Sequence, residues 1–354
     1  MVTDQRAALR ERVDKALAGY LADRRAWMAA VDPTLAPLAD AVEAFVLRGG
    51  KRLRPAFAYW GYRGAGGPDT DAVVAAVSAL EFVQASALMH DDIIDRSDTR
   101  RGEPAIHRRF AAQHRALRYV GDPDGFGEGA AILLGDLCLV WSDDMLHAGG
   151  LDPATVARAR PVFDEMRAEV TVGQYLDLHS QASGDHSVER AGVVARYKSA
   201  KYTVERPMLL GAAIADAPVE VRTAYSGFGM PLGEAFQLRD DVLGVFGDPA
   251  QTGKPIGDDL REGKRTFLVA AAYEMTGDAG REVLDRLLGD PALDPAGVTT
   301  LREVIVASGA AERTERRIDA LTTAALEALD GAPLDPDAAR VLHDLADAAT
   351  RRTD

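Results

Sequence analysis

Apolar residues recur three and four positions apart along almost the whole chain, as they do on one face of a helix. The pattern is clear in AVVAAVSALEFVQASALMH at 72–90, in AAILLGDLCLVWSDDMLHA at 130–148 and in FQLRDDVLGVF at 236–246. Alternating runs rich in β-branched residues, which indicate strands, are scarce. The pattern therefore predicts an all-α protein.

Clusters of Gly, Pro and Asp interrupt this pattern and predict the ends of helices. They are GYRGAGGPDT at 61–70, GDPDGFGEG at 121–129, GGLDP at 149–153, ASGDHS at 182–187, GDPAQTGKPIGDD at 247–259 and LGDPALDPAG at 288–297. None of them is a long flexible linker, and no repeat of fixed period is visible, which disfavours a helical solenoid. We expect one helical domain over residues 1–354.

The composition narrows the classes of function. The 354 residues include 55 acidic and 41 basic side chains, giving a formal net charge of -14. This charge argues against nucleic acid as the main partner, because phosphate backbones bind cationic surfaces. The single cysteine, Cys138, fits a reducing compartment and a small core residue. The N-terminus is too charged for a signal peptide, and no later apolar run is judged long enough for a transmembrane segment, so we expect a cytoplasmic protein.

Three carboxylates lie at the end of the first long apolar run, in the segment MHDDIIDRSDTRRGEP. The helix is expected to begin near Asp71, and on it Gln84, Asp91 and Asp95 share one face, with Asp92 beside them. Like charges at this spacing repel, and a hard divalent cation such as Mg²⁺ would offset the repulsion. A solvated acidic helix end is the alternative, and one such cluster leaves both interpretations open.

A second acidic cluster follows the same logic in FQLRDDVLGVFGD. Gln237, Asp240, Asp241, Gly244 and Asp248 lie near one face of a helix within an apolar run. Gly in a helix interior costs about 1 kcal/mol relative to Ala, so Gly244 indicates either a packing requirement or room beside the carboxylates. Two acidic helix faces that oppose one another would form a metal clamp for a diphosphate.

Basic residues are grouped beside these acidic clusters. The groups are Lys51, Arg52 and Arg54 in RGGKRLRP, Arg100 and Arg101 after the first acidic cluster, Lys198 and Lys201 in YKSAKYT, and Lys254 and Lys264 after the second acidic cluster. Taken singly, each fits a solvated surface charge, but their repeated placement favours a shared site for a polyanion. The P-loop spacing is absent, so a nucleoside triphosphate is not the expected ligand.

The ordered motifs resemble those of the trans-isoprenyl diphosphate synthases, also called polyprenyl synthetases, over nearly the whole chain. In order, they are GGKRLRP at 49–55, DDIID at 91–95, RRGEPAIH at 100–107, KSA at 198–200, FQLRDD at 236–241 and GK at 253–254. The resemblance implies a single large helical bundle around a deep central cavity, of the isoprenoid synthase type, which works with Mg²⁺ as a homodimer. It also implies condensation of isopentenyl diphosphate with dimethylallyl, geranyl or farnesyl diphosphate.

The same resemblance implies a role for each motif residue. Asp91 and Asp95 would hold two Mg²⁺ ions and Asp240 a third, with Asp92 and Asp241 belonging to the same catalytic motifs. The implied contacts of the allylic diphosphate are Arg100, Lys198, Ser199, Gln237 and Lys254, those of isopentenyl diphosphate are Lys51, Arg54, Gln84 and Arg101, and Lys264 is a further substrate-binding cation.

Two positions depart from the family pattern. The family often has Lys-Thr where this chain has Lys198-Ser199, and Lys201 competes for that alignment. Gly244 stands where many relatives have the last Asp of the second motif, although variants that end as here at Asp248 occur in geranylgeranyl-type members.

The length of the product is expected to depend on the residues one turn before Asp91. Ser86 and Ala87 are small, whereas relatives that stop at farnesyl diphosphate have aromatic residues near these positions. The small residues favour geranylgeranyl diphosphate or a somewhat longer product, as in bacterial geranylgeranyl diphosphate synthases. Val83, with Leu80, would form a deeper floor, and Phe82 would do so if its ring turned inward.

Other classes of protein explain less of the sequence. A class I terpene cyclase also ionises an allylic diphosphate, but it has less need of a second diphosphate site such as GGKRLRP. A noncatalytic, prenyl-binding regulatory subunit of a synthase tends to lose an acidic motif, and both are intact here. A purely structural helical protein leaves the paired acidic and basic clusters unexplained.

Overall fold

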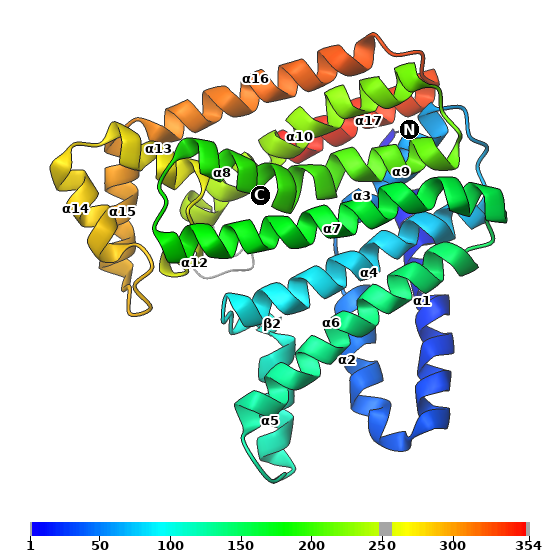
Figure 1. Cartoon of the computed structure of the whole chain (residues 1–354), viewed down its shortest axis with the longest axis horizontal. Helices are drawn as coiled ribbons and strands as arrows, with labels where there is room; N and C mark the ends of the chain where they lie inside the picture. The colour runs from blue at the N-terminus through cyan, green and yellow to red at the C-terminus, as the bar shows by residue number, and fades with distance from the viewer. Residues whose placement is uncertain (1, 248–256, 352–354) are drawn as a thin grey trace.

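The computed structural model describes residues 2–247 and 257–351, and these residues form a helical protein (Figure 1). The elements of the first half are α1 (Val2–Val31), η1 (Pro33–Leu35), α2 (Ala36–Leu47), α3 (Leu53–Gly64), α4 (Asp71–Ile94), β1 (Thr99–Arg100), β2 (Glu103–Pro104), α5 (Ile106–Ala116), α6 (Pro123–Ala148) and α7 (Pro153–Ser183). The two strands form a short antiparallel ladder. The all-α prediction is confirmed.

The second half continues the helical pattern. Its elements are α8 (Val188–Val194), the π-helix η2 (Ala195–Glu205), α9 (Arg206–Ile214), α10 (Val219–Phe246), α12 (Asp258–Arg261), α13 (Phe267–Met275), α14 (Asp278–Leu287), α15 (Pro295–Ala307), α16 (Ala310–Asp330) and α17 (Pro336–Thr350). Figure 1 shows α14 and α15 at the left end of the molecule and the hairpin of α1 and α2 projecting at the lower right.

Side chains cap several helices at their predicted starts. The hydroxyl of Thr70 accepts a hydrogen bond from the Val73 N–H, so α4 begins at Asp71 as expected. The predicted break at 121–129 is wrong over most of its length, because Asp122 caps α6 and the helix runs through the glycines. A Cβ at Gly127 would lie 2.1 Å from the carbonyl oxygen of His107. Glycine there allows α5 and α6 to pack closely.

Helix α4 is buried along most of its length. It is long and apolar enough to cross a membrane, so the expectation that no apolar run reaches that length is wrong. In the structure, however, 72% of its most apolar window is buried inside the protein. Neighbouring helices thus cover this apolar surface, as expected for the core helix of a folded protein.

The buried hydrophobic residues form two clusters. The larger one includes α1, α3, α4, α6 and α9, and the smaller one includes α12 to α15. Helix α10 belongs to both, since Phe228 and Leu232 lie in the larger cluster and Leu238 and Val245 in the smaller one. That residues 1–354 form one domain stays a prediction.

Candidate active site

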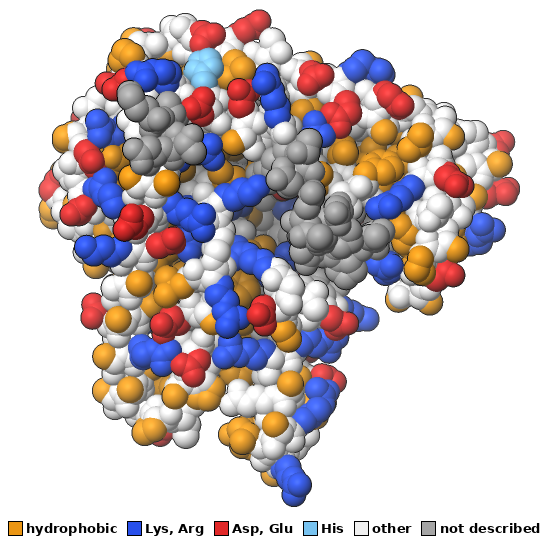
Figure 2. Space-filling view, turned by 180° about the vertical axis from the view of Figure 1, so that it is seen from behind, with side chains coloured by type: hydrophobic (Ala, Val, Ile, Leu, Met, Phe, Trp, Pro, Cys, Tyr) orange, Lys and Arg blue, Asp and Glu red, His pale blue; other side chains and the backbone are white. Residues whose placement is uncertain are grey.

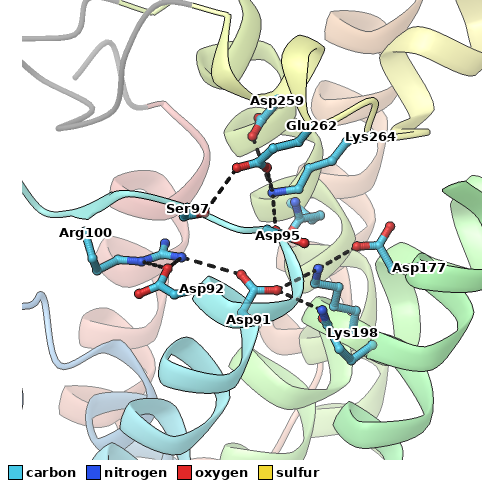
Figure 3. Close-up of polar contacts among 12 residues, drawn as sticks. Asp91, Asp92, Asp95, Ser97, Arg100, Asp177, Lys198, Asp259, Glu262 and Lys264 are labelled. Atoms are coloured by element: carbon cyan, nitrogen blue, oxygen red, sulfur yellow. Dashed lines mark hydrogen bonds and ion pairs between the residues drawn. The ribbon is translucent and has the colours of Figure 1, made fainter. Parts of the chain in front are cut away.

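The first acidic cluster stands at the C-terminal end of α4. The side chains of Asp92 and Asp95 are only 1% and 3% exposed, and that of Asp91 is 17% exposed. Negative charge is unfavourable at this pole of a helix, and burial adds to the cost. Each of the three carboxylates is in contact with a basic side chain (Figure 3).

The β1–β2 turn places Arg100 against this helix end. Arg101 and Gly102 have positive φ angles of 55° and 75°, which fold the chain back over α4. The Nε of Arg100 donates to Oδ1 of Asp92 at 2.8 Å, and its NH2 lies 3.6 Å from Oδ2 of Asp91. Arg100 is therefore oriented by Asp92 beside the carboxylate of Asp91.

Lys198 approaches the same carboxylates from η2. Its Nζ donates to Oδ2 of Asp177 at 2.6 Å and to Oδ1 of Asp91 at 3.4 Å, and Gln174 Nε2 donates to Asp91 at 2.8 Å. A Cβ at Gly173 would lie 2.3 Å from the backbone nitrogen of Lys198, so glycine there allows α7 to approach η2. Sequence reasoning missed Gln174 and Asp177, although polar residues three apart on a helix share a face.

The structure separates Lys198 from Lys201. Lys201 forms an ion pair with Glu169, which also accepts hydrogen bonds from Arg206. In a π-helix the hydrogen bonds run from i to i+5, and the wider turn directs residues three apart to different sides. Lys198 consequently faces Asp91, and Lys201 does not.

The second acidic cluster lies on the last turns of α10. Gln237 Nε2 donates to Oδ1 of Asp241 at 2.8 Å, and Asp240 is partly buried next to it. Burial, together with the charges of Asp259, Asp240 and Asp177, raises the pKa of Asp241 to about 8. A pKa this high indicates that too little positive charge lies nearby to stabilise the ionised form of Asp241.

A third group of charges comes from the segment that includes α12. The Nζ of Lys264 lies 3.1 Å from Asp95, 2.6 Å from Glu262 and 3.6 Å from Asp259. A Cβ at Gly244 would lie 1.9 Å from Oδ2 of Asp259. Gly244 therefore leaves room for this carboxylate. Asp259 and Glu262 were not identified as site residues from the sequence, because they lie in or next to a charged segment that was predicted to interrupt the helices.

The chemistry of these residues fits a divalent cation. Carboxylate oxygens are the ligands that Mg²⁺ prefers, and α4, α10 and α12 all contribute them. Burial and the charge of Asp91 raise the pKa of Asp95, so additional positive charge would be favourable. In residues 2–247 and 257–351, no three acidic, His or Cys side chains are grouped closely enough for one ion. The ammonium groups of Lys198 and Lys264 lie among the carboxylates instead.

Residues predicted to hold isopentenyl diphosphate meet beside η2. The hydroxyl of Tyr202 donates to Oε1 of Gln84 at 2.8 Å. The guanidinium of Arg54 lies 4.2 Å from the Tyr202 ring centre and donates to Thr203 at 3.0 Å. Tyr202 was not among the predicted site residues, yet it contacts two of the predicted ligands, Gln84 and Arg54. Burial raises the pKa of the Tyr202 hydroxyl.

The remaining cations of this group are closer to solvent. Arg101 donates to the Arg48 carbonyl oxygen at 3.0 Å, and Lys51 is exposed just before α3. Figure 2 shows Lys and Arg side chains gathered around a hollow in the middle of the face opposite that of Figure 1. An acidic chain thus presents a locally cationic surface, which suits a polyanionic ligand.

The predicted chain-length residues lie in the buried part of α4. Ser86 and Val83 are each 1% exposed, and Ala87 is partly buried one turn before Asp91. The ring of Phe82 packs against Tyr20 of α1 and Trp141 of α6.

Four other residues were considered in the sequence analysis. Asp248 and Lys254 lie outside the described residues. Ser199 is partly buried next to Lys198. Cys138 is fully buried, which raises the pKa of its thiol to about 12 and fits the predicted core role.

Comparison with known proteins gives a consistent result. The family model described as polyprenyl synthetase matches residues 36–305. A geranylfarnesyl diphosphate synthase from Aeropyrum pernix is 32% identical, over 86% of this chain and 91% of its own length. A geranylgeranyl diphosphate synthase from Mycobacterium tuberculosis is 31% identical, over 81% of this chain and 77% of its own length.

Solved structures agree. The geranylgeranyl pyrophosphate synthase from Corynebacterium glutamicum, complexed with isoprenyl diphosphate and magnesium, superposes with a TM-score of 0.94 and 41% identity, covering 97% of this chain and 98% of that one. A polyprenyl synthase from Caulobacter crescentus, complexed with calcium and isoprenyl diphosphate, superposes with a TM-score of 0.80 and 26% identity, covering 100% of this chain and 98% of that one.

Proposed function

This chain belongs to the polyprenyl synthetase family, and we propose that it condenses isopentenyl diphosphate with an allylic diphosphate to give geranylgeranyl diphosphate. It is a trans-prenyltransferase with prenyl diphosphate substrates. The observation that carries the proposal is the convergence of carboxylates from α4, α7 and α12 on Lys198 and Lys264. Such a site can bind a metal diphosphate.

A divalent metal is part of this proposal, and we propose three Mg²⁺ ions held by Asp91, Asp95 and Asp240. The ions would supply positive charge to the diphosphate of the allylic substrate. Lys198 and Lys264 already lie among these carboxylates, so their ammonium groups are placed to donate hydrogen bonds to the same diphosphate. Ser199, Gln237 and Lys254 complete the proposed allylic site.

The reaction needs no covalent nucleophile. As the allylic C–O bond breaks, negative charge grows on the diphosphate, and the Arg100, Lys198 and Lys264 cations stabilise it. The double bond of isopentenyl diphosphate then attacks the allylic cation, and a proton is lost to form the new double bond. We propose the departed diphosphate as the acceptor of that proton. Lys51, Arg54, Gln84 and Arg101 are proposed to hold isopentenyl diphosphate.

Chain length is proposed to be limited along the buried face of α4. Ala87 lies one turn before Asp91 and Val83 one turn before that, so a tail extending away from the diphosphate would pass small side chains first. The ring of Phe82 packs between α1 and α6, which supports Leu80 and Val83 as the deeper floor.

Ala87→Phe and Ser86→Phe test this assignment. Each variant is expected to shift the main product to a shorter chain, because an aromatic ring fills the space beside α4. Products made from labelled isopentenyl diphosphate and Mg²⁺ would be dephosphorylated and sized by chromatography. Unchanged product length in both variants would contradict the chain-length proposal, but not the prenyltransferase activity.

The activity itself is tested with dimethylallyl, geranyl and farnesyl diphosphate in turn. Elongation of at least one acceptor to a C20 product is expected, and it should stop when EDTA removes the metal. No elongation of any acceptor, or a cyclic hydrocarbon from an allylic diphosphate alone, would contradict the proposed function.

We also propose that the protein is a cytoplasmic homodimer. The exposed face of α6 carries Ile132, Leu133 and Val140, and that of α7 carries Val172 and Tyr175, with exposed fractions from 45% to 67%. An apolar surface of this kind typically forms an interface. Light scattering should give twice the mass of the chain, and Leu133→Glu should reduce it to the monomer mass. A monomeric wild type would refute the dimer.

A further inference from the structure

A pocket of about 480 Å³ lies among α8, η2, α10, α13 and α16. Its apolar wall includes Val193, Leu238 and Phe267, and its charged side carries Arg196, Arg313 and Arg317. Figure 1 shows α8, α13 and α16 near one another at the end of the molecule that carries α14 and α15. Its size falls within the range of small-molecule sites.

The guanidinium groups are held in place over the pocket. Arg196 Nε donates to Glu234 at 2.8 Å and Arg317 NH2 donates to the other oxygen of Glu234 at 3.0 Å. Arg313 and Arg317 lie one turn apart on α16, with guanidinium carbons 5.7 and 5.6 Å from the Phe267 ring centre. Contact with the carboxylate and the ring limits the motion of these side chains.

The arginines retain capacity for an anion. Glu234 is 9% exposed and shares one negative charge between two guanidiniums. Arg313 pairs with Glu274, which does not line the pocket. A guanidinium has five N–H donors, and in the described part of the chain each of the three donates one hydrogen bond to a carboxylate.

The pocket is distinct from the proposed substrate site but shares its walls. On η2, Arg196 lines the pocket and Lys198 contacts Asp91. On α10, Leu238 lines the pocket, whereas its neighbour Gln237 binds Asp241. Of the proposed diphosphate ligands within residues 2–247 and 257–351, none lines the pocket.

We propose that this pocket is a second binding site, for a small amphipathic anion with a phosphate or carboxylate head and an apolar chain. The head binds Arg313 and the free N–H groups of Arg196 and Arg317. The chain lies against Val193, Leu238 and Phe267. The fixed guanidiniums and the apolar wall are both needed for this selectivity.

Gly192 provides a direct test. It lines the pocket on α8, and a Cβ at this position would have no neighbouring heavy atom within 4 Å. Gly192→Trp should therefore fill the pocket while it keeps every charge. Arg313→Ala removes one cation, and Arg316→Ala is the matched control, because Arg316 is an exposed arginine on the same helix that does not line the pocket.

Isothermal titration of the full chain with n-octyl phosphate measures the binding. We expect one site in the wild type, at least tenfold weaker binding in Gly192→Trp and Arg313→Ala, and binding within twofold of wild type in Arg316→Ala. Thermal unfolding would verify that each variant is folded. Titration with octanoate distinguishes a carboxylate head from a phosphate head.

Several results would overturn the proposal. Full-strength binding in Gly192→Trp would place the probe elsewhere, including in the substrate site. If octanol bound as tightly as octyl phosphate, then the arginines would not contribute to binding. If inorganic phosphate bound as tightly as octyl phosphate, then the apolar wall would not contribute. Absence of binding to the wild type would remove the site altogether.

Discussion

Gly244→Ala should separate the stability of this protein from its metal binding. A Cβ at residue 244 would lie 1.9 Å from Oδ2 of Asp259, whereas distances below 3.0 Å are essentially never observed. The carboxylate must therefore move by at least 3.0 − 1.9 = 1.1 Å. Because the obstructing atom belongs to the carboxylate of Asp259 and not to the backbone, it can move without disturbing α10.

The two effects on folding nearly cancel. Ala in a helix is favoured over Gly by up to about 1 kcal/mol. The displaced carboxylate weakens the contact of Asp259 with Lys264, which is 3.6 Å long, while Lys264 keeps its closer contacts with Asp95 at 3.1 Å and Glu262 at 2.6 Å. We therefore take the cost as that of a weak ion pair, up to about 1 kcal/mol. The free energy of unfolding should change by less than about 1 kcal/mol. Asp259 contacts Lys264, which in turn contacts the proposed metal ligand Asp95. Disturbing a residue that orients a metal ligand typically costs about 10- to 100-fold in metal affinity.

The assay is Mg²⁺ titration in the presence of inorganic diphosphate, followed by the shift in thermal unfolding temperature. Gly244→Ala should raise the Mg²⁺ concentration at half effect by about 10- to 100-fold. Gly19→Ala is the control, because a Cβ at this α1 position has no neighbour within 4 Å. It should leave the Mg²⁺ midpoint unchanged.

A double-mutant cycle identifies the cause. If Gly244→Ala acts through Asp259, then it should have little further effect on the Mg²⁺ midpoint once Asp259→Ala is present. An unchanged midpoint in Gly244→Ala, or an equal loss in the Asp259→Ala background, would refute this reasoning. A large loss of folding stability would also refute it, because it would mean that the backbone rather than the carboxylate yields.

Three further predictions follow from the contacts around η2. Lys198→Gln should lower kcat by about 100-fold or more, whereas Lys201→Gln should mainly lower the unfolding temperature; equal kinetic losses would contradict the assignment. Tyr202→Phe should raise KM for isopentenyl diphosphate about 2- to 10-fold with kcat unchanged, because the amide of Gln84 loses a hydrogen bond; a loss in kcat alone would disprove that role. Burial raises the pKa of Glu205, so the folded state loses stability as pH rises from the unfolded value of about 4.3 through the raised one. Denaturant unfolding should therefore show Glu205→Gln gaining more over wild type at pH 8 than at pH 5, and a pH-independent difference would exclude the ionisation as its cause.

The sequence by itself determined the helices and the approximate composition of the site. Periodic apolar residues specify helical faces locally. The start of α4 is also set locally, because the Thr70 side chain accepts a hydrogen bond from Val73, only three residues away. The spacing of Asp91 and Asp95 follows from helix geometry alone. Because these signals are local, they can be read before the fold is known.

Only the tertiary structure decided which charges meet. Lys198 contacts Asp177 and Asp91, and Lys264 contacts Asp95, across separations of 21, 107 and 169 residues that no local pattern encodes. The choice between Lys198 and Lys201 depends on a π-helix, since its wider turn sends the two ammonium groups to different carboxylates. Gly244 was conspicuous in the sequence, but its reason, the carboxylate of Asp259, exists only after two distant segments have packed together.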